Sequence, residues 1–166
     1  MYKLKAGTIS DIEDIWMIIE RTWLESRISG LDRVEMIKML DLTHSIKKIR
    51  AEILNNYQRY ILISEREAPV AFASYSVTGV HPPDFQIHKM YNLPSTEGKG
   101  YNKVLISHIE HLAIDRGCRK LTVNVKQEEK KQYFESLGFL ATQKPDTAEQ
   151  ITEQKTFTMV KVLTKA

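Results

Sequence analysis

The sequence predicts a mixed α/β fold, in which a central sheet carries helices on its faces. Segments with strand character and segments with helical periodicity alternate along the chain. One strand–helix–strand unit spans residues 85–125, and we expect its two strands to be parallel with a right-handed connection. The 166 residues fit a single domain over 1–166 and are enough to build a hydrophobic core.

The N-terminal residues predict one strand and one amphipathic helix. Residues 2–7 alternate in polarity, which indicates a strand. Ser10 and Glu13 have the spacing of a capping box, so we expect a helix to begin there and Gly30 to end it. We expect the two tryptophans of this helix to anchor the core, with an aromatic substrate wall as the alternative. The apolar residues at helical spacing are Ile12, Ile15, Trp16, Ile19 and Trp23.

A second helical region and three strands are predicted next. The helical region spans 34–53 in two parts, with Thr43 as a candidate N-cap between them. The residues 67–69 indicate a turn between the first two strands, and Pro94 closes the third. Runs rich in β-branched and aromatic residues predict the strands 60–65, 70–79 and 85–93.

The C-terminal part predicts a helix that begins after a glycine-rich turn at 98–100 and ends at Gly117. The expected inner face of this helix consists of Val104, Leu105, His108, Ile109 and Leu112. The remaining elements, in chain order, are a strand over 121–125, a short helix over 127–137 that Gly138 ends, and an antiparallel pair of strands over 139–144 and 157–163 with a polar loop between them.

Composition and charge exclude several classes of function. Hydrophobic residues make up 42% of the chain, and the formal charge of +3 comes from scattered basic residues, not from the concentrated stripe of a nucleic-acid-binding protein. No apolar run approaches the roughly 20 residues that span a bilayer. The N-terminus lacks the apolar segment of a signal peptide, so we expect a cytoplasmic protein without nucleic-acid or membrane partners. Cys118, the only cysteine, is expected to be a buried structural thiol.

The glycine-rich turn is the main candidate for a binding site. A helix start exposes backbone N–H groups without internal partners, and the helix dipole adds about half a positive charge there. Gly98 and Gly100 have no Cβ, so a ligand can approach the backbone closely. Together with the amides through Lys103, they predict a cradle for an anion such as phosphate. The alternative is a plain strand-to-helix turn that needs glycine for its dihedral angles.

In its wider context this turn resembles the GNAT N-acetyltransferase superfamily. The stretches IHKMYNLPSTEGKGYNKVL, RGCRKLTVNV and KKQYFESLGF follow the family's order of strand, proline, glycine-rich turn, helix, strand and final helix, without a gap from Ile87 to Phe139. The resemblance implies a mostly antiparallel sheet with helices on both faces. It also implies acetyl-CoA as co-substrate, with the pyrophosphate in the cradle, and a direct attack by the amine without a covalent intermediate.

The resemblance further implies that the strand 89–93 splays from the strand 121–125 and pairs its backbone with the pantetheine arm. Backbone amides near residues 90–92 would polarise the thioester carbonyl. The residues expected to bind the cofactor are Met90, Tyr91, Asn92, Glu97, Gly98, Lys99, Gly100, Tyr101, Asn102, Lys103, Asn124, Gln127 and Phe134.

Three positions depart from the family's pattern. Glu97 stands where Gln or Arg is common and would repel a pyrophosphate, which Lys99 and Lys103 can offset. Asn102 replaces the usual Gly or Ala. Phe134 replaces the tyrosine that protonates the leaving thiolate, and the adjacent Tyr133 is the substitute candidate, although neighbouring helical side chains point roughly 100° apart. The alternative is that both aromatic residues belong to the core.

The base is the second open role. Many relatives have a Glu where this chain has Gln86, and His88 follows on the same side of the strand with a pKa suited to base work. A structural histidine is the alternative, and Glu65 with Tyr75 would then hold a water chain.

We expect no metal site, because the other histidines lack ligand spacing with carboxylates. These are His44, His108 and His111, whereas His81 lies in a predicted loop and is expected to be a surface residue, with a place beside the acceptor site as the alternative.

The acceptor and the assembly are predicted only in outline. The N-terminal layout looks like the spermidine/spermine-type members, and a polyamine would favour acidic residues such as Glu25, Asp32, Glu35 and Asp41. A small amine or a protein amine is also compatible with the sequence. The family resemblance implies a homodimer, since its last strands often pair or swap. The competing hypothesis is a catalytically degenerate module that binds CoA or another partner, motivated by Glu97, Asn102 and Phe134.

Overall fold

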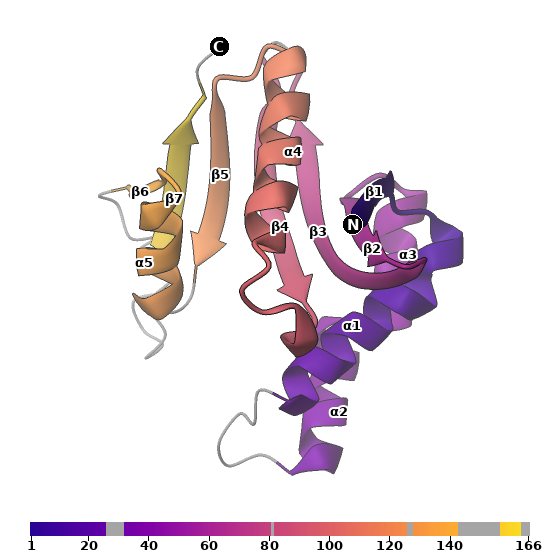
Figure 1. Ribbon diagram of the computed structural model, residues 1–166. Helices are drawn as coiled ribbons and strands as arrows, with labels where there is room; N and C mark the ends of the chain where they lie inside the picture. The colour runs from indigo at the N-terminus through magenta and orange to yellow at the C-terminus, as the bar shows by residue number, and fades with distance from the viewer. Residues whose placement is uncertain (26–31, 81, 126–127, 143–156, 164–166) are drawn as a thin grey trace. The chain divides into compact units, whose positions relative to one another are not determined.

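The computed structural model describes residues 1–25, 32–80, 82–125, 128–142 and 157–163 (Figure 1). The chain divides into two compact units, which we describe separately. The first unit comprises Met1–Tyr75 and Lys89–Ile106, and the second comprises Ser76–His88 and Ser107–Ala166. The expectation of a single domain over 1–166 stays a prediction. Among the described residues, no helix has the length and apolar character required to cross a membrane.

The elements alternate as the sequence predicts. The strands are β1 (Tyr2–Ala6), β2 (Arg59–Glu65), β3 (Ala68–Thr78), β4 (Asp84–Asn92), β5 (Lys120–Val125), β6 (Leu140–Ala141) and β7 (Phe157–Val162). The helices are α1 (Ile12–Glu25), α2 (Arg33–Thr43), α3 (Ile46–Leu54), α4 (Tyr101–Asp115) and α5 (Glu128–Ser136), with short 3-10 helices η1 (Ile9–Asp11) and η2 (Pro94–Thr96).

The strands form a sheet of seven in the order β1-β2-β3-β4-β5-β7-β6. β4 and β5 pair in parallel, as predicted for the strand–helix–strand unit, whereas β1–β2, β2–β3, β5–β7 and β6–β7 pair antiparallel. The mixed, mostly antiparallel α/β fold is therefore confirmed, and so is the final antiparallel pair of strands.

In the first unit, α1 packs its apolar face against α2 and α3 (Figure 1). Its fully buried residues are Ile15, Ile18 and Ile19, which lie at the spacing of one helix face. β2 is buried continuously over residues 60–63, and β3 over 70–75, because both are internal strands of the sheet. Trp16 and Trp23 are half-buried, and the expectation that they anchor the core stays a prediction.

Two predicted boundaries in the first unit are corrected. The capping box is formed by Thr8 and Asp11, not by Ser10 and Glu13, because η1 precedes α1 and moves the helix start toward the N-terminus. Thr43 is the last residue of α2 and not an N-cap; Ser45 caps α3 by accepting a hydrogen bond from the Lys48 N–H at 3.1 Å. The predicted end of the first helix at Gly30 lies outside the described residues.

The turn between β2 and β3 is also shifted from its predicted place. It lies at Arg66 and Glu67, which both have positive φ angles, 49° and 67°. Ala68 and Pro69 already belong to β3. A two-residue turn with this backbone matches the twist of an antiparallel pair, and the sequence signal is weak because neither residue is Gly or Asn.

In the second unit, α5 lies against β5, β6 and β7. The Phe134 ring packs edge-on against Phe139, with 5.4 Å between centroids, and Met159 of β7 is fully buried. Cys118 is buried and its Sγ donates to the Lys120 carbonyl at 2.9 Å, which confirms the structural thiol. The predicted polar loop before β7 lies outside the described residues.

The predicted inner face of α4 is confirmed in part. Leu105 and Ile109 are buried, whereas Val104, His108 and Leu112 are half-buried. The other buried positions of this helix are Tyr101, Ile106 and Ala113.

Candidate functional site

The end of β4 is fixed within the first unit by hydrogen bonds. The Leu93 N–H donates to the Val70 carbonyl at 2.8 Å, and the buried Thr96 Oγ1 donates to the Leu93 carbonyl at 2.6 Å. η2 starts with Pro94, which suits the first helical position because no N–H partner is needed there. The chain therefore leaves the strand at a defined place, directly before the glycine-rich turn.

Gly98 and Gly100 have φ angles of 84° and 76°, in the left-handed region that side chains with a Cβ disfavour. A Cβ built on either glycine would meet no other described atom within 4 Å. Lys99 between them donates its N–H to the Thr96 carbonyl at 3.1 Å, which closes the turn. The glycines are thus required by the backbone, and the space beside each is open.

α4 presents unpaired backbone N–H groups next to this turn. Its first backbone hydrogen bond joins the Val104 N–H to the Gly100 carbonyl at 3.2 Å. The N–H groups of Tyr101, Asn102 and Lys103 precede that bond and have no acceptor within the helix. The dipole of the helix adds about half a positive charge at the same end. An anion with several oxygen atoms suits this arrangement.

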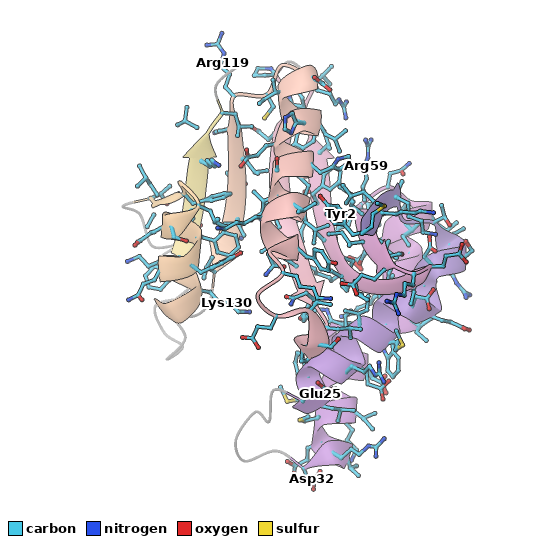
Figure 2. All side chains as sticks on the ribbon, viewed as in Figure 1. Tyr2, Glu25, Asp32, Arg59, Arg119 and Lys130 are labelled. Atoms are coloured by element: carbon cyan, nitrogen blue, oxygen red, sulfur yellow. The ribbon has the colours of Figure 1, made fainter. Side chains whose placement is uncertain are left out.

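A carboxylate of the first unit lies beside the same turn. Glu65, the last residue of β2, accepts a hydrogen bond from Lys99 Nζ at 2.8 Å and another from the Tyr101 hydroxyl. The Tyr2 ring of β1, labelled in Figure 2, packs edge-on against the Tyr101 ring, with 5.5 Å between centroids. The bonds from Lys99 and Tyr101 hold the pKa of Glu65 below its usual range, and the bond to Glu65 raises the pKa of Tyr101 to about 12.

Neither Glu97 nor Asn102 comes within 4 Å of the place where Gly100 would carry a Cβ. Glu97 and Lys103 are exposed. Asn102 is half-buried, and its Oδ1 is buried without a hydrogen-bond partner among the described residues. A buried polar atom left in this state costs about 1–3 kcal/mol unless water or a ligand meets it. The mouth of α4 therefore fits a ligand that has both anionic oxygens and hydrogen-bond donors, as coenzyme A does.

The parallel ladder between β4 and β5 covers only three residue pairs, from Phe85–Leu121 to Ile87–Val123. The next residues of the second unit, His88 and Asn124, are not paired with each other among the described residues. Asn124 is exposed, and its Oδ1 accepts a hydrogen bond from Thr158 Oγ1 at 3.2 Å. Gln127, another predicted cofactor residue, lies outside the described residues.

His88 is exposed on β4, and its Nε2 lies 2.7 Å from Ser76 Oγ on β3. The hydroxyl of Ser76 can fix the tautomer of the ring, and the exposure leaves the imidazole accessible to solvent. On α5, Tyr133 is half-buried and its ring packs edge-on against Phe134 at 5.7 Å. Phe134 is buried against Phe139, as expected for a core residue.

Lys89 of β4 is the centre of a buried polar network that the sequence reasoning missed. Its Nζ donates to both carboxylate oxygens of Glu52 at 2.9 and 2.8 Å, to the Tyr60 hydroxyl at 2.8 Å and to Gln58 Oε1 at 3.3 Å. Ser74 Oγ donates to the same Gln58 oxygen at 2.7 Å. Burial lowers the pKa of Lys89 although Glu52 opposes this, and burial also raises the pKa of Tyr60.

Tyr91 follows Lys89 on the same side of β4 and joins an aromatic group. Trp23 Nε1 donates to the Tyr91 hydroxyl at 3.3 Å, and His44 Nε2 lies 3.3 Å from the same oxygen. The Tyr91 ring stacks on Phe72, with 5.5 Å between centroids. Burial raises the pKa of Tyr91. Trp23 therefore helps to hold the strand that the sequence predicts as cofactor-binding.

Glu65 and Tyr75 lie at opposite ends of the β2–β3 ladder, where Glu65 faces Ala68 and Tyr75 faces Arg59. Glu65 is bonded to Lys99 and Tyr101, whereas Tyr75 is buried elsewhere on β3, so no contact between Glu65 and Tyr75 supports a shared water chain. Within the described ranges, no group of three or more His, Cys, Asp or Glu residues has the arrangement of a metal site.

Comparison with known proteins gives a family and a fold. The family model for the acetyltransferase (GNAT) family matches residues 16–139. The PaiA N-acetyltransferase from Thermoplasma acidophilum, solved in complex with coenzyme A, has 14% identity and a TM-score of 0.80, with 98% of this chain and 99% of that chain covered. No curated protein matches the sequence.

Two further solved structures have the same fold. The GCN5-related N-acetyltransferase from Rhodopseudomonas palustris has 22% identity and a TM-score of 0.73, over 97% of this chain and 95% of that chain. The ribosomal-protein-S18-alanine N-acetyltransferase from Escherichia coli has 16% identity and a TM-score of 0.70, over 100% of this chain and 96% of that chain.

Proposed function

The chain belongs to the acetyltransferase (GNAT) family, and we propose that it transfers the acetyl group of acetyl-CoA to a primary amine by direct attack. The observation that carries the proposal is the mouth of α4, where Gly98 and Gly100 have positive φ angles and open space beside them. When bound, acetyl-CoA supplies an acetyl group already activated as a thioester. The following roles concern the residues of this chain.

The glycine-rich turn and the first amides of α4 are proposed to hold the pyrophosphate. The N–H groups of Tyr101, Asn102 and Lys103 point where a helix start binds anions, and no Cβ at Gly98 or Gly100 limits the approach. The backbone of residues 90–92 is proposed to pair with the pantetheine arm and to polarise the thioester carbonyl.

His88 is proposed to take the proton from the acceptor, directly or through a water. A primary amine has a pKa of about 10.4 and is mostly protonated at neutral pH, so it must lose a proton before or during the attack. The exposed imidazole has Ser76 Oγ 2.7 Å away to orient it. Phe134 has no proton for the leaving thiolate, and a thiolate with a pKa of about 8.5 can leave with water or Tyr133 as the proton source.

A polyamine is the acceptor that we propose first, because four carboxylates on or beside α1 and α2 could meet its ammonium groups. Glu25, Asp32, Glu35 and Asp41 are all exposed on α1 and α2 or at their ends, and Figure 2 labels Glu25 and Asp32. Asp32 also caps α2, because its side chain accepts from the Glu35 N–H at 2.8 Å. One structural neighbour is named as acting on an alanine of a ribosomal protein, so protein amines belong in the same panel of acceptors.

The binding step is tested by calorimetry with coenzyme A and acetyl-CoA. We expect Gly100→Val to weaken binding by at least about tenfold, because a branched side chain would enter the approach path. Gly117→Val is the matched control: Gly117 has a φ of 78° and equally open surroundings at the other end of α4, so it carries the same backbone strain. Intact binding by Gly100→Val would contradict the cradle.

Turnover is tested by thiol release over a panel of polyamines, small amines and peptide N-termini. We expect His88→Gln to lower kcat by about a hundredfold, because general-base catalysis typically contributes 10²-fold or more, with the affinity for acetyl-CoA unchanged. His108→Gln on α4 is the control. Full turnover by His88→Gln would remove His88 from this role. Tight binding with no turnover on any amine would favour the catalytically degenerate module.

A further inference from the structure

We propose that Glu65 holds Lys99 in an ion pair as long as no cofactor is bound. When coenzyme A binds, Lys99 leaves the Glu65 carboxylate and pairs with a phosphate of the cofactor. This inference rests on the proposed function of the glycine-rich turn. It assigns to Glu65 the role of a positioning residue that sets the affinity of the turn for its anionic ligand. Glu65 acts through Lys99 and does not itself contact the cofactor.

Lys99 forms an ion pair with Glu65 that is exposed enough to break. Lys99 Nζ lies 2.8 Å from Glu65 Oε1, and the two side chains are 49% and 25% exposed. Exposed ion pairs of this kind are weak, because water solvates both charges. A lysine–phosphate contact is a charge-assisted hydrogen bond to a group with more negative charge. The exchange is therefore favourable once a phosphate is present.

The backbone around Lys99 permits the exchange. Its two neighbours are Gly98 and Gly100, and no described atom beyond the adjacent residues lies within 4 Å of the place where either would carry a Cβ. The lysine thus stands in a turn without packing contacts at its flanks, and its side chain can rotate without disturbing a core. Glu65 also keeps a second donor, the hydroxyl of Tyr101, after Lys99 has left.

Lys103 provides the internal comparison. It lies in the first turn of α4, and its ammonium has no ion-pair partner among the described residues. Both lysines stand near the helix start and carry the same charge. Only Lys99 is neutralised by a carboxylate, so the effect of Glu65 should be felt through Lys99 and not through Lys103.

A double-mutant cycle read by calorimetry with coenzyme A tests the proposal. We expect Glu65→Gln to tighten binding by about two- to fivefold at low salt, since the released ammonium is worth about as much as an exposed ion pair. The amide oxygen of Gln still accepts from the Tyr101 hydroxyl. In a Lys99→Met background the same change should have no effect, whereas in a Lys103→Met background it should keep its full effect.

Two controls separate the proposal from simpler explanations. Lys161→Met removes an ion pair of the second unit that has no proposed role in binding, and we expect unchanged affinity. If Glu65 merely repelled the phosphates, Glu65→Gln would tighten binding equally in the Lys99→Met background, and that result would overturn the proposal. Weaker binding by Glu65→Gln would overturn it as well, because Glu65 would then be holding the turn in its binding conformation.

The experiment also distinguishes this inference from the function on which it rests. If the unmodified chain binds no coenzyme A, both proposals fail together. If it binds and Glu65→Gln has no effect, only the partner exchange is wrong. The low-salt effect should shrink as salt is added, since the pair and its phosphate competitor are both exposed to screening.

Discussion

The first unit holds two lysine–glutamate pairs that have the same chemistry and opposite surroundings. Lys89 and Glu52 lie 2.8 Å apart with side chains 10% and 15% exposed, and Lys99 and Glu65 lie 2.8 Å apart with side chains 49% and 25% exposed. Equal distances therefore say little about what each pair does. The difference lies in the cost of separating the partners.

The more buried pair exchanges its partner less readily, because little water is available to solvate a separated charge. Lys89 is surrounded by acceptors from α3, from β2 and from the loop between them, and Tyr60 donates in turn to Glu52 at 3.2 Å. Breaking such a pair leaves an uncompensated buried charge. It therefore fixes the strand 89–92, whereas the exposed pair leaves the adjacent turn free to respond to a ligand.

The largest expected effect comes from removing one partner of the buried pair. We expect Lys89→Met to lower the free energy of unfolding by about 3–5 kcal/mol, because Glu52 would stay buried and unpaired. Urea denaturation measures this change. The double variant Lys89→Met/Glu52→Leu should recover most of the loss, because well-packed apolar residues often replace a buried pair without cost. No recovery would mean that hydrogen bonds to Tyr60 and Gln58, and not the charges, dominate.

A smaller effect is expected in the aromatic group beside the same strand. Tyr91→Phe removes the hydroxyl that Trp23 and His44 approach, and we expect a loss of about 1 kcal/mol, the typical net value of a hydrogen bond. The ring would still stack on Phe72. Thermal unfolding monitored by near-UV circular dichroism would follow both stability and the environment of Trp23. A loss of unfolding free energy as large as that of Lys89→Met would mean that the aromatic group stabilises the unit as much as the ion pair does.

The smallest effect on stability is expected for the exposed pair. Lys99→Met should shift the urea midpoint by about a tenth of the shift caused by Lys89→Met, because solvent already screens both charges. Lys161→Met in the second unit is a control, since Lys161 pairs with Glu110 at 2.7 Å with intermediate exposure of both side chains. A large loss of stability on Lys99→Met would show that the exposed pair holds the turn in place. The two ion pairs would then not differ in their contribution to stability.

The pH dependence sharpens the same contrast. The bonds from Lys99 and Tyr101 lower the folded pKa of Glu65 below its ordinary value of 4.5. Its stabilising contribution is therefore present above pH 4.5 and is lost as the pH falls through the folded pKa. The small stability difference between the unmodified chain and Glu65→Gln should accordingly exist at pH 6 and vanish in stronger acid. A difference that persists at pH 2 would not come from the charge of Glu65.

Much of the fold follows from local patterns. The alternation of strands and helices, the parallel β4–β5 unit and the glycine ends of α4 and α5 depend on residue spacing within a few turns or strands. Boundaries were less well predicted where two local signals compete. Thr8 and Ser10 both resemble N-caps, and only the position of η1 selects Thr8. The turn at Arg66 and Glu67 has no strong local signal, because the strand pairing imposes its backbone.

The candidate site divides in the same way. The glycine-rich turn was recognisable because the requirement for positive φ is written into Gly98 and Gly100 themselves. The ion-pair partners of Lys89 and Lys99 could not be recognised from the sequence. Glu65 is 34 residues from Lys99 and Glu52 is 37 residues from Lys89, and a lysine within a strand signals at most that some carboxylate meets it.

The sequence by itself determined the order of the elements, the glycine-rich turn before α4 and the family to which these motifs belong. The tertiary structure decided which charges meet: it buried Lys89 with Glu52 and left Lys99 on Glu65 at the surface. The physical reason is that backbone preference is a property of neighbouring residues, whereas the strength of an ion pair depends on how much water the rest of the fold leaves around it.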